Sequence, residues 1–460
     1  MIDAERIGEA TRSKSEAGLR REALPFIEVL AQSVANIAPT ATPALAIPLV
    51  FANGGNGTWL SFLLATIGLV LVGYNIKQFA AHSTTPGSLY SYTLTGLGPT
   101  AGFITGWSLI IAYLATGFVV VLGFTIFAGD LLKSIGLEVP PVLLFALDAA
   151  VIWFFAYKDI RLSVKAMLIL EAFSVLAILV LGLVVVGNKG IIDTNQLTLQ
   201  GANFDGLRLS LVLAILGFVG FESACSLGVE AKNPSQNIPR AVIWSTIAVG
   251  IFFIVMAYIE VLGFQGLSTT LDKSGAPLNA LAEAFQVPFL GTVISIGAAL
   301  SFFACGLACV NAVSRVLFSM SRDGVIHSSM GQAHVTNETP HIAATLSAVL
   351  LFLVPAVLSL SGIALLDAYV YTGTIATFGF LLAYILISVA APIYLKRQNS
   401  LKTSHIVVAV LAIILMLIPV YGSLLPVPDY PLSLLPYLYL GYMLVGVAWM
   451  FYDRRRRKQG

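Results

Sequence analysis

Charged side chains are scarce in this sequence. Only 10% of its 460 residues are charged, whereas 58% are hydrophobic, and the mean hydropathy is +0.90. Soluble domains carry about a quarter charged residues, so this chain lacks the polar surface that a water-soluble fold requires. The composition indicates an integral membrane protein, for which no nucleic-acid partner is expected.

Cysteine is also scarce, and the three present lie in apolar segments. Cys305 and Cys309 are four residues apart and share a helix face, but neither a His nor a third Cys accompanies them. We therefore expect Cys225, Cys305 and Cys309 to be small packing residues without a structural disulfide. The five His residues show no metal-ligand spacing to Asp, Glu or Cys. Neither a metal site, nor a cofactor, nor an enzymatic activity is predicted.

Ten-residue strands of alternating polarity are missing, which excludes a membrane β-barrel. Apolar runs of about 20 residues are present instead, and each could cross roughly 30 Å of hydrocarbon as a helix. The first run is too long for a signal peptide, so it should be retained. Twelve transmembrane helices are predicted, near 26–50, 58–81, 101–128, 140–157, 163–187, 209–229, 240–264, 290–318, 342–361, 367–394, 404–425 and 432–451.

Basic residues indicate the orientation of these helices. If the N-terminus is placed inside, only Lys133, Lys189, Arg208 and Lys273 of the 25 basic residues fall outside. Cytoplasmic loops are enriched in Lys and Arg, so we expect a multi-pass protein of the cell (plasma) membrane with both termini in the cytoplasm.

The same reasoning divides the chain into four parts. Residues 1–25, with Arg6, Arg12 and Lys14, form a cytoplasmic N-terminal segment. Residues 26–400 form the core, and residues 401–451 form the last two helices. Residues 452–460 form a basic cytoplasmic tail, in which the run from Arg454 to Lys458 is expected to anchor the topology beside anionic lipid.

The first and sixth runs are interrupted. "SVANIAPTATPAL" (33–45) contains Pro39 and Pro43, each of which removes one helical hydrogen bond. "AILGFVGFESACSLGVEAKNP" (214–234) has spaced glycines around a mid-span carboxylate, Glu222. Unwound backbone at membrane depth persists only where protein buries it or it lines a wet cavity. Breaks in the first and the sixth span predict two inverted five-helix repeats, with the substrate bound between the broken helices. The alternative is that proline and glycine only kink these two helices.

Four motifs in consistent order carry a family resemblance over about residues 25–400. They are "TPGSLYSYTLTGLGPTAGFITGW" (85–107), "GFESACSLGVEAKNPSQNIPRA" (220–241), "SRVLFSMSRDG" (314–324) and "YTGTIATFGFLLAYILISVAAPIYLKR" (371–397). The chain resembles the amino acid–polyamine–organocation transporters, and within them the amino acid permeases. This resemblance implies an all-α integral membrane fold of the LeuT-like 5+5 type, with discontinuous helices 1 and 6. It also implies secondary active transport by alternating access.

The sequence departs from the family pattern at three places, one of which is the run "VIHSS" after Gly324, where many members have a proline. "PTAT" (39–42) stands where many members have a glycine-rich stretch, and Ser174 stands where many have a fifth-helix lysine. These differences bear on the substrate and the coupling ion rather than on the fold.

A zwitterionic amino acid needs partners for both of its charges. Free N–H groups at a broken helix suit a carboxylate, and Thr40, Ala41 and Thr42 are the candidates, together with the two Thr hydroxyls. Carbonyl oxygens of the broken ends suit the ammonium. These candidates are Ala35, Asn36, Ile37 and Ala38 in the first run and Leu216 to Gly220 in the sixth. Phe218 and Phe221 are candidate gates, with ordinary packing as the alternative.

Two intramembrane carboxylates are candidates for ion coupling. Glu222 must be protonated, paired or functional, because an unpaired charge at mid-depth costs several kcal/mol. Glu171 raises the same question, and basic residues nearer the cytoplasm are its expected partners. Ser301 has no adjacent Ser or Thr, so too few oxygen ligands are available for a sodium site. The lysine that replaces this ion in some relatives is also missing, because Ser174 stands at its position. Proton-coupled symport or exchange is therefore favoured.

Charged residues also gather at predicted cytoplasmic helix ends. Arg315 and Arg322 are seven residues apart and share a helix face. With Glu230 they could form an inner gate that breaks and re-forms, or they could simply be solvated helix ends.

Three other functions remain as alternatives. A polyamine or organic cation transporter would need more acidic groups in its cavity than Glu222 alone. A membrane enzyme would need a catalytic constellation, and a sensor would need a signalling domain. The expected partners are an amino acid, protons and the lipid bilayer, for a monomer or homodimer.

Overall fold

The computed structural model describes residues 18–425 and 427–459, with side chains described as far as residue 452. Arg6, Arg12 and Lys14 lie outside the described residues, as do the side chains from Arg454 to Lys458. The described chain is helical apart from its loops and one isolated β-bridge. The prediction of an all-helical protein is confirmed.

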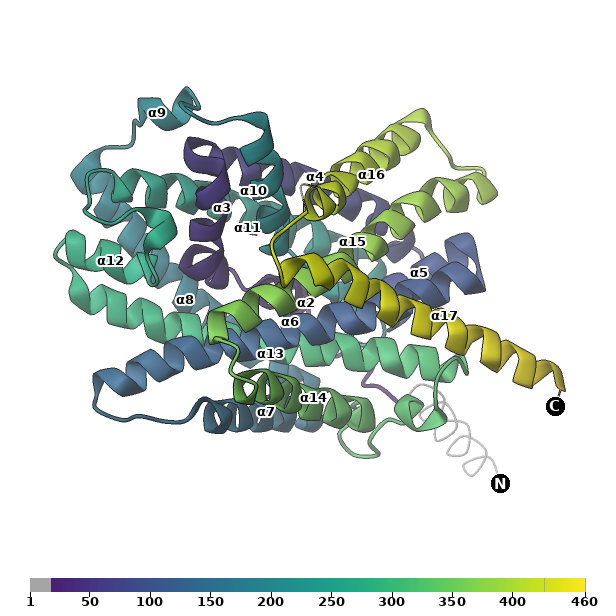
Figure 1. Ribbon diagram of the computed structural model, residues 1–460. Coiled ribbons are helices and arrows are strands. Elements are labelled where there is room, and N and C mark those ends of the chain that lie inside the picture. Colours follow the sequence, from purple (N-terminus) through teal and green to yellow (C-terminus); the bar gives the residue numbers. More distant parts are fainter. Residues whose placement is uncertain (1–17, 426, 460) are drawn as a thin grey trace.

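The helices follow one another along the chain with short connections (Figure 1). The α-helices are α2 (Phe26–Ile37), α3 (Ile47–Gly54), α4 (Thr58–Ala80), α5 (Ser88–Leu97), α6 (Pro99–Ser134), α7 (Pro141–Lys158), α8 (Ile160–Lys189), α9 (Thr194–Leu197), α10 (Phe204–Leu216), α11 (Pro234–Phe264), α12 (Pro277–Ala284), α13 (Pro288–Arg322), α14 (His341–Leu360), α15 (Leu365–Arg397), α16 (Thr403–Leu424) and α17 (Leu435–Gln459). A π-helical turn, η1 (Thr42–Ala46), precedes α3, and the 3-10 segment η3 (Ser223–Leu227) follows α10.

Ten stretches of the described residues are long and apolar enough to cross a membrane. The first of them, Phe26–Ala80, contains α2, α3 and α4. Helices suit the bilayer because they satisfy their backbone hydrogen bonds internally, where no water can do so. The chain is therefore a multi-pass membrane protein.

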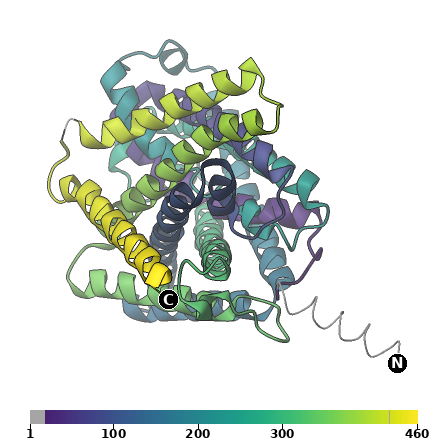
Figure 2. The ribbon, with the colours of Figure 1, turned by 90° about the vertical axis from the view of Figure 1, so that its right-hand side faces the viewer.

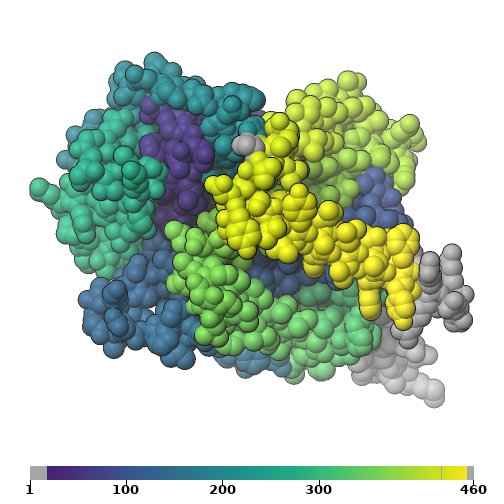
Figure 3. Space-filling model, viewed as in Figure 1, coloured from purple at the N-terminus to yellow at the C-terminus, as the bar shows by residue number. Residues whose placement is uncertain are grey.

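The two longest helices, α6 and α13, pack side by side through the centre of the molecule (Figures 1 and 2). Small residues allow this approach. A Cβ added at Gly123 of α6 would lie 2.5 Å from the ring of Phe302 on α13, so any larger residue would require the ring to move. By contrast, α17 lies across the outer surface (Figure 3), where its Tyr442 stacks on Trp107 of α6. The core thus surrounds α6 and α13.

Both interrupted runs depart from helical geometry at the proline and glycine positions. The helix α2 ends at Ile37, and Ala38 adopts a left-handed conformation (φ 52°) before the chain turns into η1. Regular helix in the sixth run ends at Leu216, and Gly220 has a φ of 88°. The two breaks contact each other, because a Cβ at Gly220 would lie only 1.6 Å from Nδ2 of Asn36.

A short segment before α2 is paired with the chain that follows η3. Leu24 and Ala231 form a parallel β-bridge, and the Ala23 amide donates to the carbonyl of Glu230 at 2.7 Å. Arg20 extends this attachment by pairing with Asp159 at 2.5 Å, and it also reaches Glu338 at 3.3 Å. We call residues 18–24 the N-terminal strap.

The strap lies at the end of the molecule where several helices finish with basic residues. Lys77 of α4, Arg322 of α13 and Arg397 of α15 occupy the last turns of their helices. Hydrogen bonds join these regions, for instance from Arg397 to the carbonyl of Thr95. We call this end the basic end.

Candidate functional site

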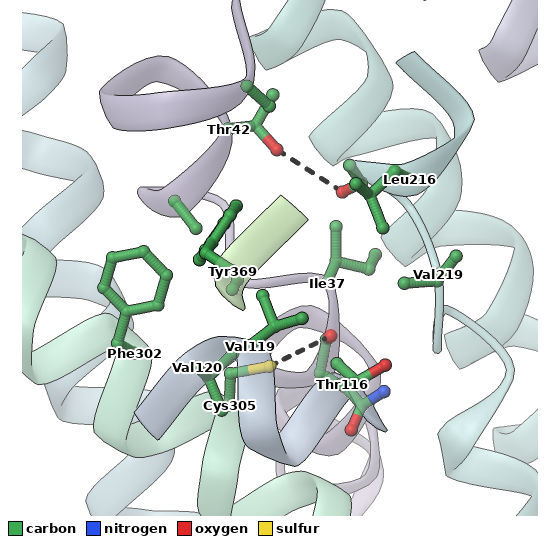
Figure 4. Close-up of a pocket in the computed structure, with 15 residues that line it drawn as sticks. Ile37, Thr42, Thr116, Val119, Val120, Leu216, Val219, Phe302, Cys305 and Tyr369 are labelled. Carbon is green, nitrogen blue, oxygen red and sulfur yellow. Dashed lines mark hydrogen bonds between the residues drawn. The ribbon is translucent and has the colours of Figure 1, made fainter. Parts of the chain in front are cut away.

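A cavity lies between the two helix breaks (Figure 4). The cavity is narrow in this conformation, with a volume of about 40 Å³. Six helical elements (α2, η1, α6, α10, α13 and α15) and the two breaks contribute to it. The lining residues are Asn36, Ile37, Ala38, Ala41, Thr42, Ala46, Thr116, Val119, Val120, Leu216, Gly217, Val219, Phe302, Cys305 and Tyr369.

The walls of the cavity are mostly apolar. Figure 4 shows Ile37, Val119 and Val219 on one side and the ring of Phe302 on the other. No residue that lines this cavity carries a carboxylate, an ammonium or a guanidinium group. The lining therefore suits an uncharged, apolar group.

Most polar atoms around the cavity already have partners within the protein. The Thr116 hydroxyl donates to the carbonyl of Ala112 at 2.9 Å, and the Cys305 thiol donates to the carbonyl of Asn36 at 3.3 Å. The Thr42 hydroxyl reaches the carbonyl of Gly217 across the two breaks at 3.5 Å. These bonds hold α2, η1, α10 and α13 around the cavity.

Asn36 is the exception. Its side chain is 1% exposed, and within the described residues neither Oδ1 nor Nδ2 has a hydrogen-bond partner. An unpaired buried polar group costs about 1–3 kcal/mol. The amide offers one acceptor and two donors, so Asn36 is able to contact both an ammonium and a carboxylate.

The backbone groups expected to bind a zwitterion are only partly free. The Ala41 amide donates to the carbonyl of Ala38 at 2.9 Å, and the Ala38 amide donates to the carbonyl of Ala35 at 3.0 Å. In this conformation the Ala41 amide is therefore already bonded, because the left-handed turn at Ala38 folds the broken end back onto itself. Thr40 lies outside the cavity lining, and its buried hydroxyl has no partner among the described residues.

Glu222 is fully buried and is held by two tyrosines. Tyr113 of α6 donates to Oε1 at 2.7 Å, and Tyr384 of α15 donates to Oε2 at 2.6 Å. The Tyr384 hydroxyl also accepts the Gly220 amide at 3.3 Å. Through Gly220 and Asn36, this carboxylate is connected to the edge of the cavity without lining it.

The two phenylalanines of the sixth run pack into the protein. The ring of Phe218 lies 4.9 Å from that of Phe253 on α11 in an edge-to-face arrangement. The ring of Phe221 lies 5.2 Å from that of Tyr384. Both side chains are fully buried, and in the described structure neither lines the cavity.

Glu171 has a different partner from the one expected. The Ser301 hydroxyl of α13 lies 2.9 Å from both carboxylate oxygens. The expectation of basic partners is wrong, because at this depth α8 packs against α13, whose facing side chains are small. Ser174, one turn further along, donates to the carbonyl of Gly297 at 2.7 Å.

Glu230 and Arg315 are brought together, whereas Arg322 is not. The Arg315 guanidinium binds both oxygens of Glu230, and both side chains are buried. Arg322 is exposed and has no ion pair among the described residues; its guanidinium lies 5.7 Å from the centre of the Phe318 ring. The alternative of solvated helix ends therefore fails for Arg315.

Sequence reasoning missed the contributions of α6, α13 and α15. Tyr113 and Thr116 of α6 are polar residues three positions apart in an apolar helix, so they share one face. That spacing was the available signal for a buried polar side of this helix. Nothing comparable marks Phe302, Tyr369 or Tyr384 in the sequence.

The fold and the cavity define a class of protein: a helical membrane protein with a pocket between two interrupted helices. A family model described as amino acid permease matches residues 29–448. The chain belongs to the amino acid permease family. It is accordingly a membrane transporter of small molecules and not an enzyme.

Several characterised relatives align over most of the chain. The branched-chain amino acid permease BcaP of Bacillus subtilis is 26% identical over 371 residues, which cover 76% of each protein. The methylthioribose transporter of the same organism is 25% identical and covers 77% of each. The low-affinity putrescine importer PlaP of Escherichia coli is 26% identical, covering 70% of this chain and 71% of its own.

Proposed function

We propose that this protein is a secondary active transporter that carries amino acids with apolar side chains across the cell membrane by alternating access. The observation that carries the proposal is the uncharged cavity between the two breaks. Its apolar walls suit an aliphatic side chain, and the unpaired Asn36 amide suits the charged end of an amino acid. The similarity to a branched-chain amino acid permease supports the same substrate class.

The binding mode places the side chain of the substrate between Val119, Phe302 and Tyr369. Its ammonium and carboxylate lie at the broken ends, with Asn36 and the Thr42 amide as contacts. Burying the aliphatic group removes apolar surface from water at about 25 cal/mol per Å². The side-chain amide of Asn36, which has no partner within the described residues, would also gain hydrogen bonds to the bound substrate.

The proposed architecture has twelve transmembrane helices in a LeuT-like arrangement. The first repeat comprises the spans from α2 to α8, and the second comprises those from α10 to α15. Contact between Asn36 and Gly220 supports this pairing, because each residue lies at the break of the first span of its repeat. Both termini are placed in the cytoplasm, consistent with the basic residues at one end of the molecule.

Proton coupling or exchange is proposed rather than sodium symport. Glu222 is the principal candidate, since its contacts to Tyr113, Tyr384 and Gly220 connect it to the substrate cavity. A gain or loss of its proton would change these hydrogen bonds and hence the position of the sixth-run break. Glu171 is the second candidate, and the inner gate consists of Glu230 and Arg315.

The test is uptake into proteoliposomes. Labelled leucine, isoleucine, valine, alanine, lysine and putrescine are supplied in turn, with pH and sodium gradients imposed separately. Accumulation of the aliphatic amino acids under an inward proton gradient, or by exchange, supports the proposal. Failure of every amino acid to be transported or to compete would refute it.

A polyamine substrate is the second candidate because PlaP is a putrescine importer. A diamine has two cationic ends, and burying each requires a carboxylate or several carbonyl groups. The absence of any acidic residue among those that line the cavity disfavours this alternative. Strong uptake of putrescine without competition by leucine would favour it.

A further inference from the structure

A second hollow lies at the basic end, on the outside of the helical core. It is formed between the end of α4 and the beginning of α11, and none of its lining residues lines the transport cavity. Lys77, Arg240 and Trp244 line it, together with the polar side chains of Ser235 and Gln236. No acidic residue contributes to its lining.

The two cations in this hollow are not neutralised by the protein. Lys77 and Arg240 are exposed, and neither forms an ion pair within the described part of the chain. Two like charges that line one recess repel each other unless an anion joins them. The recess therefore has the electrostatics of an anion site.

The surroundings of the hollow specify where such an anion comes from. Trp244 is 58% exposed, and the exposed side chains of Ile251 and Val255 follow it on the same face of α11. Eleven residues of helix extend roughly 17 Å at 1.5 Å per residue, which is close to half of a hydrocarbon core of about 30 Å. Exposed Trp at the end of a span is typical of the membrane–water interface. The exposed apolar side chains of α11 thus extend over about the thickness of one membrane leaflet, beginning beside the unpaired Lys77 and Arg240.

We propose that this hollow binds the headgroup of an anionic phospholipid. Lys77 and Arg240 contact its phosphate, and the hydroxyl of Ser235 and the amide of Gln236 add neutral donors. The acyl chains lie along Trp244, Ile251 and Val255. Since α11 is joined through residues 229–233 to η3 and the strap, a bound lipid would hold the beginning of α11 at the membrane surface.

The experiment uses Trp244 as the reporter. The full-length protein is reconstituted in phosphatidylcholine vesicles that contain 10% brominated phosphatidylglycerol or, in parallel, 10% brominated phosphatidylcholine. Bromine quenches tryptophan on contact, and subtraction of the signal of Trp244→Phe isolates this residue from the other tryptophans. Each basic residue near an anionic surface contributes roughly a fivefold preference. We expect brominated phosphatidylglycerol to quench Trp244 at least threefold more than brominated phosphatidylcholine.

Variants and a competitor separate the site from general surface attraction. The double variant K77Q/R240Q should reduce the ratio of the two quenching signals to about one. The matched control R161Q/K165Q removes one Arg and one Lys that are exposed on α8 at the same end, and it should leave the ratio unchanged.

Three results would overturn the proposal. The first is equal quenching by both lipids in the unmodified protein, and the second is a preference that survives in K77Q/R240Q. The third is loss of the preference when inorganic phosphate is added at constant ionic strength, since the hollow would then accept phosphate in general rather than a lipid.

Discussion

Arg315 and Glu230 form a buried, two-point ion pair at the basic end, with Nε to Oε2 at 2.6 Å and Nη2 to Oε1 at 2.5 Å. The pair joins α13 to the chain that follows η3. Its third contact, from Nη1 to the carbonyl of Asn311 at 2.8 Å, fixes the guanidinium against its own helix. In this conformation an ion pair therefore links α13 to the segment after η3, two parts that move relative to each other in the proposed transport cycle.

Replacing Arg315 by Met should destabilise the protein strongly. The variant leaves Glu230 buried without a counter-charge, and such losses cost about 3–5 kcal/mol. Thermal unfolding in detergent measures the effect. Arg322→Met is the matched control, because Arg322 is exposed and unpaired within the described chain, and it should change stability by less than about 0.5 kcal/mol. Equal stability of the two variants would contradict a structural role for the pair, and R315M/E230L should recover part of the loss.

Gly220→Ala should abolish transport. The added Cβ would collide with the Asn36 amide, and a φ of 88° itself disfavours any L-residue by about 1–2 kcal/mol. Initial uptake rates in proteoliposomes are the measurement. The control is Gly187→Ala, since a Cβ there meets nothing within 4 Å. If Gly220→Ala transports at the control rate, the contact between the two breaks is dispensable.

Shortening Val119 should widen substrate selection. Val119→Ala removes two methyl groups from the cavity wall, and one methylene in a hydrophobic pocket is worth about 1–3 kcal/mol. The KM for valine or leucine should rise at least several-fold, while phenylalanine should become a better competitor. Exposed Val180→Ala on the outer face of α8 is the control. An unchanged competition profile would indicate that Val119 does not contact the substrate.

Glu222→Gln should separate proton-driven uptake from exchange. Glutamine keeps the shape of the side chain but cannot gain or lose a proton, so accumulation driven by a pH gradient should disappear while counterflow of labelled substrate continues.

Tyr113→Phe and Tyr384→Phe each remove one hydrogen-bond donor to the Glu222 carboxylate, and such a bond is worth about 1.5–3 kcal/mol for a charged group. They should shift the pH profile of uptake. Tyr437→Phe, at an exposed tyrosine, is the control for these two variants. Full proton-driven uptake by E222Q would show that Glu222 is not the coupling residue.

Local chemistry made the two breaks and the buried carboxylate predictable. Pro39 and Pro43 cannot sustain regular helix, glycine permits the conformation of Gly220, and a charge such as Glu222 in an apolar run must be buried. Each inference needs only the residue and its neighbours in the chain. The family followed from motifs in order, and the permease match agrees with it.

Partners across helices could not be predicted in the same way. An apolar run fixes the depth of a residue in the membrane but not the direction in which its side chain points, which depends on packing between helices. Tyr113, Tyr384 and Ser301 were missed as partners of Glu222 and Glu171 for this reason. The self-satisfied amide of Ala41 was missed because its bond depends on the left-handed turn at Ala38.

The N-terminal strap has a practical consequence for handling the protein. Leu24 is fully buried and Leu19 is 5% exposed, so residues just before α2 form part of the folded body rather than a dispensable leader. A purification tag joined close to residue 18, or a truncation beyond it, would disturb the bridge to Ala231. Truncations made for expression or crystallisation should therefore keep every residue from 18 onward, so that Leu19, Leu24 and the bridge to Ala231 remain in place.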